Sequence, residues 1–304
     1  MSDEKKKRDW AIHINQVKIL GRVCQEPVDK GAYWRVHVVL PSWARDGHQW
    51  IKYYIDFVGL EEDQLSQIRG LKTGNFLSAT VFIVDRKIKT DGGDERSVKV
   101  LQADPYRPIG VLPAKFRDNE DPLNPTYHGI CGSQVLLAGR HSIFKKDGEE
   151  RRETPEVRDG KNSKFCLVNL RYTDPFQEIP ENEKYGVSQF FRFFANGKMA
   201  EVLGGFCKHN AQLLVRGELS KEECNFVVKG NVPRTVTIRP VPNGINFLNF
   251  GQGTVSKSPV SPRSDIYDEN DTDDLDSVPQ DEVKGNKGEE SSSPTPVDDD
   301  DLQF

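Results

Sequence analysis

The sequence predicts an all-β fold built from two consecutive copies of one small barrel, followed by an acidic segment without a core. Three observations lead to this prediction. Apolar and polar residues alternate over many short runs, one of these runs recurs further along the chain, and the composition changes near Phe250. At about 150 residues per domain, a chain of 304 residues is long enough for two folded domains.

Composition excludes several classes of protein. No run approaches the roughly 18 apolar residues that cross a membrane, and the mean hydropathy is −0.64, so an integral membrane protein is excluded. Residues 2–8 are polar and no apolar stretch follows them, which argues against a secretory signal. The five cysteines form no CxxC pair and are odd in number, which favours a reduced compartment. We therefore expect a cytoplasmic protein.

The first copy reads as three strands, a short helix and two more strands. The helix has Leu65 and Ile68 on one face and Gly70 as its stop, and residues 90–93 give a hairpin signal. The expected strands are residues 12–19, 36–40, 50–57, 76–84 and 97–101, and the expected helix is 61–69. This is the order of the OB-fold, a five-stranded Greek-key barrel that binds oligonucleotides and oligosaccharides.

A repeat supports a second OB-fold. Residues 16–22 (QVKILGR) recur as residues 134–140 (QVLLAGR), 118 positions later. The expected elements that follow are strands at 165–171, 189–195, 212–219 and 235–239 and a helix at 197–207 capped by Asn196. Residues 145–164 are a charged insertion without apolar periodicity, predicted to be a mobile loop. Five prolines between residues 105 and 125 indicate a linker between the copies.

Charge divides the chain more sharply than its net value of −5 shows. Residues 251–304 hold fifteen acidic and four basic residues, a net charge of −11, which leaves +6 on residues 1–250. The acidic segment has only two aromatic residues, Tyr267 and Phe304, and scattered aliphatic ones, so it cannot bury enough apolar surface to offset chain entropy. The predicted organisation is a first OB-fold at 1–106, a linker at 107–129, a second OB-fold at 130–250 and a disordered acidic tail at 251–304.

Several motifs together resemble those of a known family. Residues 15–23 (NQVKILGRV) followed by 25–27 (QEP) resemble the opening strand of bacterial single-stranded-DNA-binding proteins, and Trp43 and Trp50 resemble two of its tryptophans. Residues 196–202 (NGKMAEV) and 215–219 (VRGEL) are similar to its helix and the strand that follows. The tip at 298–304 (DDDDLQF) is similar to its acidic terminus, although Gln303 stands where proline is usual.

The resemblance covers nearly the whole chain and corresponds to the less common form with two OB-folds. It implies sequence-independent binding of single-stranded DNA in replication, repair and recombination, a homodimer that supplies four OB-folds, and a nucleoid-associated location. Two alternatives stay open. One is a degenerate OB-fold module that holds protein partners, and the other is an RNA-binding OB-fold protein.

Aromatic side chains are the strongest candidates for contact with bases, because sequence-tolerant binding uses flat rings on which any base can stack. Strand alternation cannot put all those of the first copy on one face, so some belong to the core. The second copy has no tryptophan, and a phenylalanine stands at the position of Trp50. The stacking candidates are Trp34, Trp43, Trp50, Tyr53, Tyr54, Phe57 and Phe190.

Basic side chains on the strands are candidates for contact with phosphates. The group at residues 86–89 stands out, because three of its four residues are positively charged and lie on a hairpin arm. The phosphate candidates are Arg22, Lys52, Lys72, Arg86, Lys87, Lys89, Arg140, Arg192, Lys198 and Arg216.

Catalysis finds little support in the sequence. No phosphate-binding loop GxxxxGK[ST], HExxH or GxSxG motif is present. Cys207 and His209 offer two metal ligands, but no second pair follows at metal-like spacing. We therefore expect a binding protein without enzymatic activity, cofactor or metal.

The acidic tip has two interpretations. An acidic run is normally a solubilising segment, but a solubilising tail has no reason to end in an aromatic residue. A terminal aromatic ring with its carboxylate can enter an apolar pocket rimmed by basic residues, while the aspartates steer the encounter. We therefore expect a partner-docking tip made of Asp298, Asp299, Asp300, Asp301, Leu302, Gln303 and Phe304.

Overall fold

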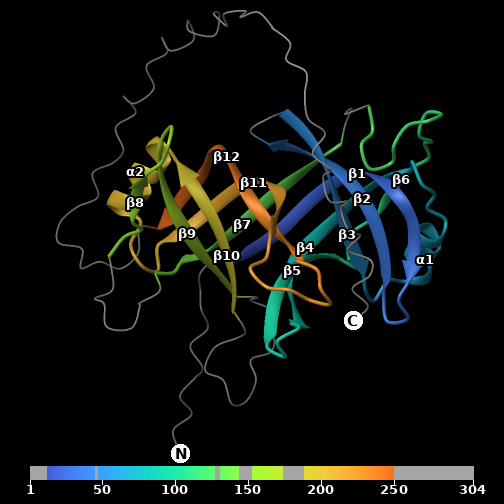
Figure 1. The fold of residues 1–304 in the computed structure, drawn as a ribbon, viewed down its shortest axis with the longest axis horizontal. Helices are drawn as coiled ribbons and strands as arrows, with labels where there is room; N and C mark the ends of the chain where they lie inside the picture. Colours follow the sequence, from blue (N-terminus) through green and yellow to red (C-terminus); the bar gives the residue numbers. More distant parts are fainter. Residues whose placement is uncertain (1–11, 45–46, 127–130, 144–152, 174–187, 250–304) are drawn as a thin grey trace, which may run out of the picture. The chain divides into compact units, whose positions relative to one another are not determined.

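The computed structural model describes residues 12–44, 47–126, 131–143, 153–173 and 188–249 (Figure 1). Within these ranges the chain forms twelve strands and two short helices, so the predicted all-β fold is confirmed. Neither described helix is long and apolar enough to cross a membrane. The predicted disordered tail and its docking tip lie outside the described residues and stay predictions.

The first copy closes into a barrel. Its elements are β1 (Ile14–Asp29), β2 (Trp34–Ala44), β3 (Gly47–Phe57), α1 (Glu62–Arg69), β4 (Phe76–Lys89) and β5 (Glu95–Ala103). β1 pairs with β2, β2 with β3, β3 in parallel with β5, β5 with β4, and β4 returns to β1. A five-stranded Greek-key barrel with the helix between its third and fourth strands is the predicted OB-fold.

The second copy repeats this order. Its elements are β7 (Gly132–His141), β9 (Lys164–Thr173), β10 (Ser188–Asn196), α2 (Lys198–Phe206), β11 (Gln212–Glu223) and β12 (Arg234–Asn249). β7 pairs with β9 and β11, β9 with β10, and β11 with β12, while β10 lies beside β12. The prediction that Asn196 caps α2 is wrong. The helix begins after Gly197, whose φ of 59° favours glycine, and no side chain caps it.

Two short strands lie where no strand was expected. β6 (Gly110–Leu112), inside the predicted linker, pairs with the start of β4, and β8 (Val157–Asp159), inside the predicted mobile loop, pairs with β9. Strands of three residues are too short to show a period of two. The linker is also held to the first barrel by Asn75, whose Nδ2 donates to the carbonyl of Ala114 at 3.1 Å.

The two barrels join through their first strands. Residues 14–20 of β1 pair antiparallel with residues 132–138 of β7 (Figure 1). Val17 lies opposite Val135, its own counterpart in the sequence repeat, and Lys18 lies opposite Gln134. The contact therefore has a local two-fold axis through the valine pair, which makes it an isologous interface within one chain.

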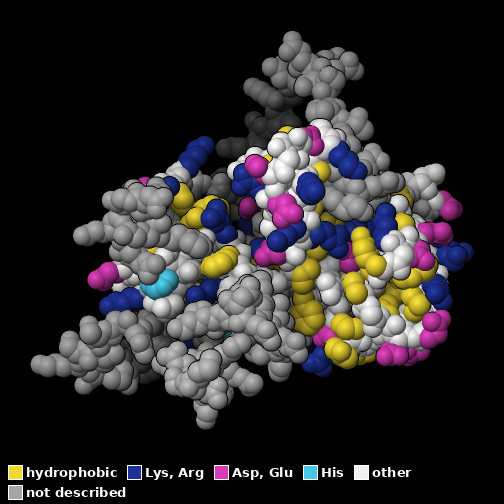
Figure 2. Space-filling model, turned by 90° about the horizontal axis from the view of Figure 1, so that it is seen from below, with side chains coloured by type: hydrophobic (Ala, Val, Ile, Leu, Met, Phe, Trp, Pro, Cys, Tyr) yellow, Lys and Arg dark blue, Asp and Glu magenta, His cyan; other side chains and the backbone are white. Residues whose placement is uncertain are grey.

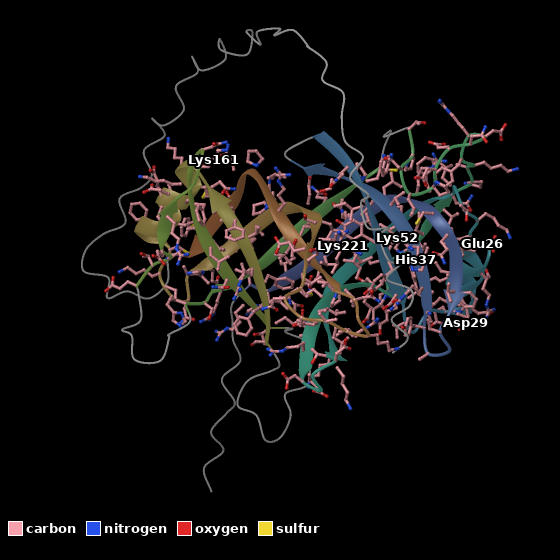
Figure 3. All side chains as sticks on the ribbon, viewed as in Figure 1. Glu26, Asp29, His37, Lys52, Lys161 and Lys221 are labelled. Carbon is pink, nitrogen blue, oxygen red and sulfur yellow. The ribbon has the colours of Figure 1, made fainter. Side chains whose placement is uncertain are left out.

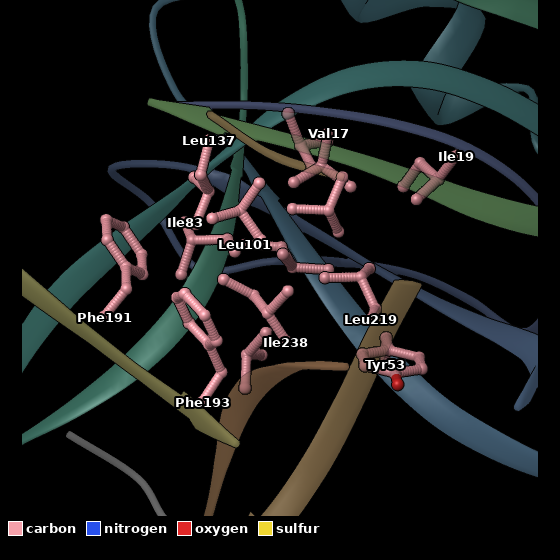
Figure 4. Close-up of a cluster of buried hydrophobic side chains, with 14 of the residues drawn as sticks. Val17, Ile19, Tyr53, Ile83, Leu101, Leu137, Phe191, Phe193, Leu219 and Ile238 are labelled. Carbon is pink, nitrogen blue, oxygen red and sulfur yellow. The ribbon is translucent and has the colours of Figure 1, made fainter. Parts of the chain in front are cut away.

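Both barrels contribute to one continuous hydrophobic core (Figure 4). Val17 and Leu101 from the first copy belong to the same buried cluster as Leu137 and Phe191 from the second. Fully burying each such side chain stabilises the fold by about 1.5–3 kcal/mol. We therefore expect the two barrels to unfold together.

The hairpin predicted at residues 90–93 of the first barrel is confirmed, and it contacts the second barrel. Its Asp91 carboxylate accepts hydrogen bonds from the backbone N–H groups of Lys229 and Gly230, the latter at 2.9 Å, in the loop between β11 and β12. The Asp91 N–H donates to the carbonyl of Val227 at 3.1 Å. The barrels are thus joined at the hairpin tips as well as at β1 and β7.

Candidate nucleic-acid interface

Strand alternation divides the aromatic candidates of β3 between two faces. Tyr53 and Phe57 point inward and are 1% and 2% exposed, so these two stacking candidates belong to the core instead. Burial raises the pKa of Tyr53, and the nearby charge of Glu218 adds to this effect. The half-buried side chains of Trp50 and Tyr54 occupy the alternate positions, on the outer face of the barrel.

Two other tryptophans do not add to this outer face. Trp34 lies opposite the inward-facing Phe57 and packs against the core, with the guanidinium of Arg69 from α1 5.7 Å from its ring centroid. The backbone of Trp43 pairs with His48, but its side chain lies outside the described residues. Trp43 therefore stays a prediction of the resemblance, and Trp34 is better explained by its packing at the barrel wall.

A layer of stacked rings and cations surrounds Tyr54, and the sequence analysis did not identify it. The guanidinium carbon of Arg35 lies 4.1 Å from the centroid of Tyr54 and 5.5 Å from that of Tyr33. The ring of His37 meets Tyr54 edge-on at 6.4 Å. Arg35 and His37 lie opposite Asp56 and Tyr54 of β3, so these side chains share one face, although Arg35 and His37 are only 4% and 1% exposed. Their alternation with Val36 and Val38 along β2 was visible in the sequence.

A buried carboxylate holds this layer together. Asp56, 1% exposed, accepts hydrogen bonds from Arg35 Nε at 2.8 Å and Nη2 at 3.3 Å, and from Arg86 Nη2. Burial lowers the pKa of Arg35, but its hydrogen bond and attraction to Asp56 outweigh burial and raise the pKa above its usual value. The three groups together carry one positive charge.

Two lysines complete the outer face. Lys52, on the same face of β3 as Tyr54, donates to Gln25 Oε1 at 3.4 Å. Lys221 comes from β11 of the second barrel, and its Nζ lies 5.5 Å from the ring centroids of both Tyr53 and Tyr54. Figure 3 labels His37 on β2, Lys52 on β3 and Lys221 on β11. The face of the first barrel therefore includes a cation from the second.

Arg22 is a structural residue, which corrects its prediction as a phosphate contact. It is 4% exposed, and its Nη2 donates to the carbonyl of Lys115 at 2.8 Å. Its guanidinium lies 4.1 Å from the ring centroid of Phe116 and 3.9 Å from Glu120. The linker covers Arg22, and a buried guanidinium with these partners is not available to DNA.

The remaining basic candidates of the first barrel are exposed. Lys72 lies 3.9 Å from Glu26, and Lys87 lies 3.8 Å from Glu95 across the hairpin. Lys89 is exposed near the tip of the same arm. The positive group at residues 86–89 therefore has acidic neighbours, which the linear sequence did not reveal.

The second barrel presents a similar mixture on β10. Phe190 and Phe194 are 38% and 48% exposed, with exposed Arg192 between them, while the alternate residues Phe191 and Phe193 are buried. Arg192 Nε donates to Asn169 of β9 at 3.2 Å. Phe190 and Arg192 were predicted, whereas Phe194, which lies on the same face of β10, was not.

The neighbouring strand β9 adds residues that the sequence analysis missed. Phe165 meets Phe194 edge-on at 6.0 Å, and Arg171 pairs with Phe190 across the strands. Arg140 of β7 also pairs with Arg171 and is half-buried. The other two predicted basic residues of this barrel are exposed elsewhere, Lys198 at the start of α2 and Arg216 on β11. Figure 2 shows one face of the molecule where hydrophobic side chains border lysine and arginine side chains.

The fold thus defines a protein with two OB-folds whose outer strands carry aromatic and cationic side chains. No family model and no curated protein matches the sequence. Among solved structures, the chain is similar to the wild-type single-stranded DNA binding protein from Thermus aquaticus, with 16% identity and a TM-score of 0.49 over 81% of this chain and 98% of that chain.

Two shorter solved structures are similar to parts of the chain. One is the small single-stranded DNA-binding protein from Streptomyces coelicolor, with 21% identity and a TM-score of 0.28 over 38% of this chain and 92% of that one. The other is a Plasmodium falciparum SSB complex with ssDNA, with 15% identity and a TM-score of 0.28 over 33% of this chain and 96% of that one.

Proposed function

We propose that this protein binds single-stranded DNA without sequence preference, as the double OB-fold form of the bacterial-type single-stranded-DNA-binding proteins that its motifs resemble. The observation that carries the proposal is the outer face of β2 and β3. There Trp50 and Tyr54 offer rings for base stacking, while Lys52 and Lys221 supply charge for the phosphates. The mechanism is binding rather than chemistry: a covered strand cannot re-form a duplex.

The second barrel provides a further platform in this proposal. Phe190, Arg192 and Phe194 alternate along β10 as aromatic, cationic and aromatic side chains on one exposed face. Because no tryptophan is present there and phenylalanine offers a smaller ring, we expect this barrel to bind a strand more weakly than the first.

Tryptophan fluorescence tests the proposal directly, because the four tryptophans at 10, 34, 43 and 50 all lie in the first copy. Saturable quenching by poly(dT), weaker at higher salt, is the expected result. Absence of quenching and of any mobility shift would favour the protein-interaction alternative. Competition between DNA and RNA oligomers of matched sequence decides the second alternative, since an RNA-binding protein prefers the RNA.

We further propose that the protein serves replication, repair and recombination by recruiting other proteins through the tip at 298–304. Deleting Phe304 alone should abolish capture of these partners by the full chain, because it removes the aromatic ring and displaces the terminal carboxylate. Affinity for poly(dT) should stay near that of the wild type, because every aspartate remains. Replacing Gln303 by alanine is the matched control. Partner capture that survives loss of Phe304 would make the tail a solubilising segment.

A homodimer is the proposed assembly, since two chains supply the four OB-folds that the resemblance implies, and closed two-fold symmetry is the commonest solution for such pairs. Light scattering at micromolar concentration should return twice the chain mass of 34.4 kDa. A mass of one chain, unchanged across a tenfold dilution series, contradicts this proposal.

A further inference from the structure

A buried acidic side chain lies within the face that we propose for DNA. A carboxylate on a surface that binds polyanions repels the phosphates, so its presence there needs a physical reason. Both oxygens of Asp56 accept hydrogen bonds, and both donors are arginines of the same face, Arg35 on β2 and Arg86 on β4. The carboxylate therefore neutralises one of two positive charges at the site.

The two arginines are held very differently. Arg35 is 4% exposed, contacts both oxygens of Asp56 through Nε and Nη2, and stacks on Tyr54. Arg86 is 24% exposed, reaches Asp56 through Nη2 alone and lies 5.4 Å from the ring centroid of Tyr33. Among the described residues, Nη1 of Arg86 is buried and has no hydrogen-bond partner, which is costly for a charged donor. Arg86 is thus the displaceable member of the pair.

We propose that Asp56 competes with the phosphates of a bound strand for Arg86 and so sets the affinity and salt dependence of the first barrel. This inference rests on the proposed function. When a strand binds, Arg86 exchanges Asp56 for a phosphate oxygen, and the two N–H donors of Arg35 keep the buried carboxylate paired. The positive charge of Arg86 therefore becomes available only when a phosphate replaces the carboxylate of Asp56.

The salt dependence of poly(dT) binding measures this exchange. Each phosphate neutralised on a single strand contributes about −0.7 to the slope of log K against log salt. Arg86→Gln should therefore weaken binding and make the slope shallower by about 0.7. Asp56→Asn should tighten binding at low salt by roughly tenfold, because Arg86 no longer has a competing carboxylate. A change of this size corresponds to about one hydrogen bond to a charged group.

A matched control separates competition from overall charge. Asp85 is next to Arg86 in β4, but its carboxylate pairs with Lys99 at 2.6 Å and is 33% exposed. Asp85→Asn makes the same change in net charge and should shift affinity much less than Asp56→Asn. In the Arg86→Gln background, Asp56→Asn should lose most of its effect, since the competed residue is gone.

The outcomes divide clearly. Wild-type protein that does not bind poly(dT) overturns the proposed function itself. Wild-type protein that binds, with a slope unchanged by Arg86→Gln, shows that Arg86 stays on Asp56 and overturns only the competition. Equal shifts for Asp56→Asn and Asp85→Asn also overturn it. If Asp56→Asn does not fold, Arg86→Gln still tests the proposal. This variant replaces a partly exposed residue, and Asp56 keeps its hydrogen bonds with Arg35.

Discussion

Replacing Trp50 and Tyr54 together by alanine is expected to weaken poly(dT) binding by about 2–6 kcal/mol, because each stacked base contributes about 1–3 kcal/mol. The two rings lie on the outer face of β3, so their loss leaves the inward-facing core residues in place. Fluorescence anisotropy with labelled oligo(dT) measures the affinity, and circular dichroism verifies folding.

The control for this prediction is Tyr106→Ala. Tyr106 is 93% exposed and lies after the end of β5, outside the strands β2 and β3 that carry the proposed site. Its removal deletes an equally large ring and should leave the affinity unchanged. A folded Trp50→Ala/Tyr54→Ala protein that binds as tightly as the wild type would refute the stacking model. Trp43→Ala is expected to behave like Trp50→Ala on the resemblance alone.

Acid should destabilise the second barrel through His141. This side chain is 1% exposed, and its Nδ1 lies 3.2 Å from the carbonyl oxygen of Asn169. Burial lowers its pKa to about 4; the hydrogen bond with Asn169 opposes the change and the charge of His209 adds to it. The unfolded chain, with the usual histidine pKa of about 6.5, therefore takes up the proton first as the pH falls.

The sign follows from this difference in proton uptake. The contribution of His141 to the free energy of unfolding is fully present above about pH 6.5 and is lost progressively toward pH 4. Between pH 7 and pH 5 the free energy of unfolding should fall by roughly 2 kcal/mol through this residue. Urea unfolding of the wild type and of His141→Gln at both pH values isolates the contribution. The variant should show a pH dependence smaller by that amount. Equal pH dependence in the two proteins would assign the acid sensitivity to other groups.

Local sequence patterns were enough to predict the architecture. Alternation in residues 50–57 predicted β3, the Gly-rich turn at 90–93 predicted the hairpin of β4 and β5, and the repeat of residues 16–22 at 134–140 predicted two barrels. These signals depend on neighbours in the chain, because a strand has a period of two and a turn needs particular residues at particular positions. The same alternation also required that some aromatic candidates of the first copy lie inside.

Only the tertiary structure decided which aromatic candidates of the first copy lie in the core. A period of two distinguishes Tyr53 from Tyr54 but does not say which of them faces the core, because that depends on the strands packed against β3. The burial of Arg22 depends on a linker carbonyl 93 positions away. The cluster of Arg35, Asp56 and Arg86 joins β2, β3 and β4, and Lys221 reaches the same face from the second barrel. Such contacts exist only after barrel closure brings distant strands together, so no local pattern in the sequence encodes them.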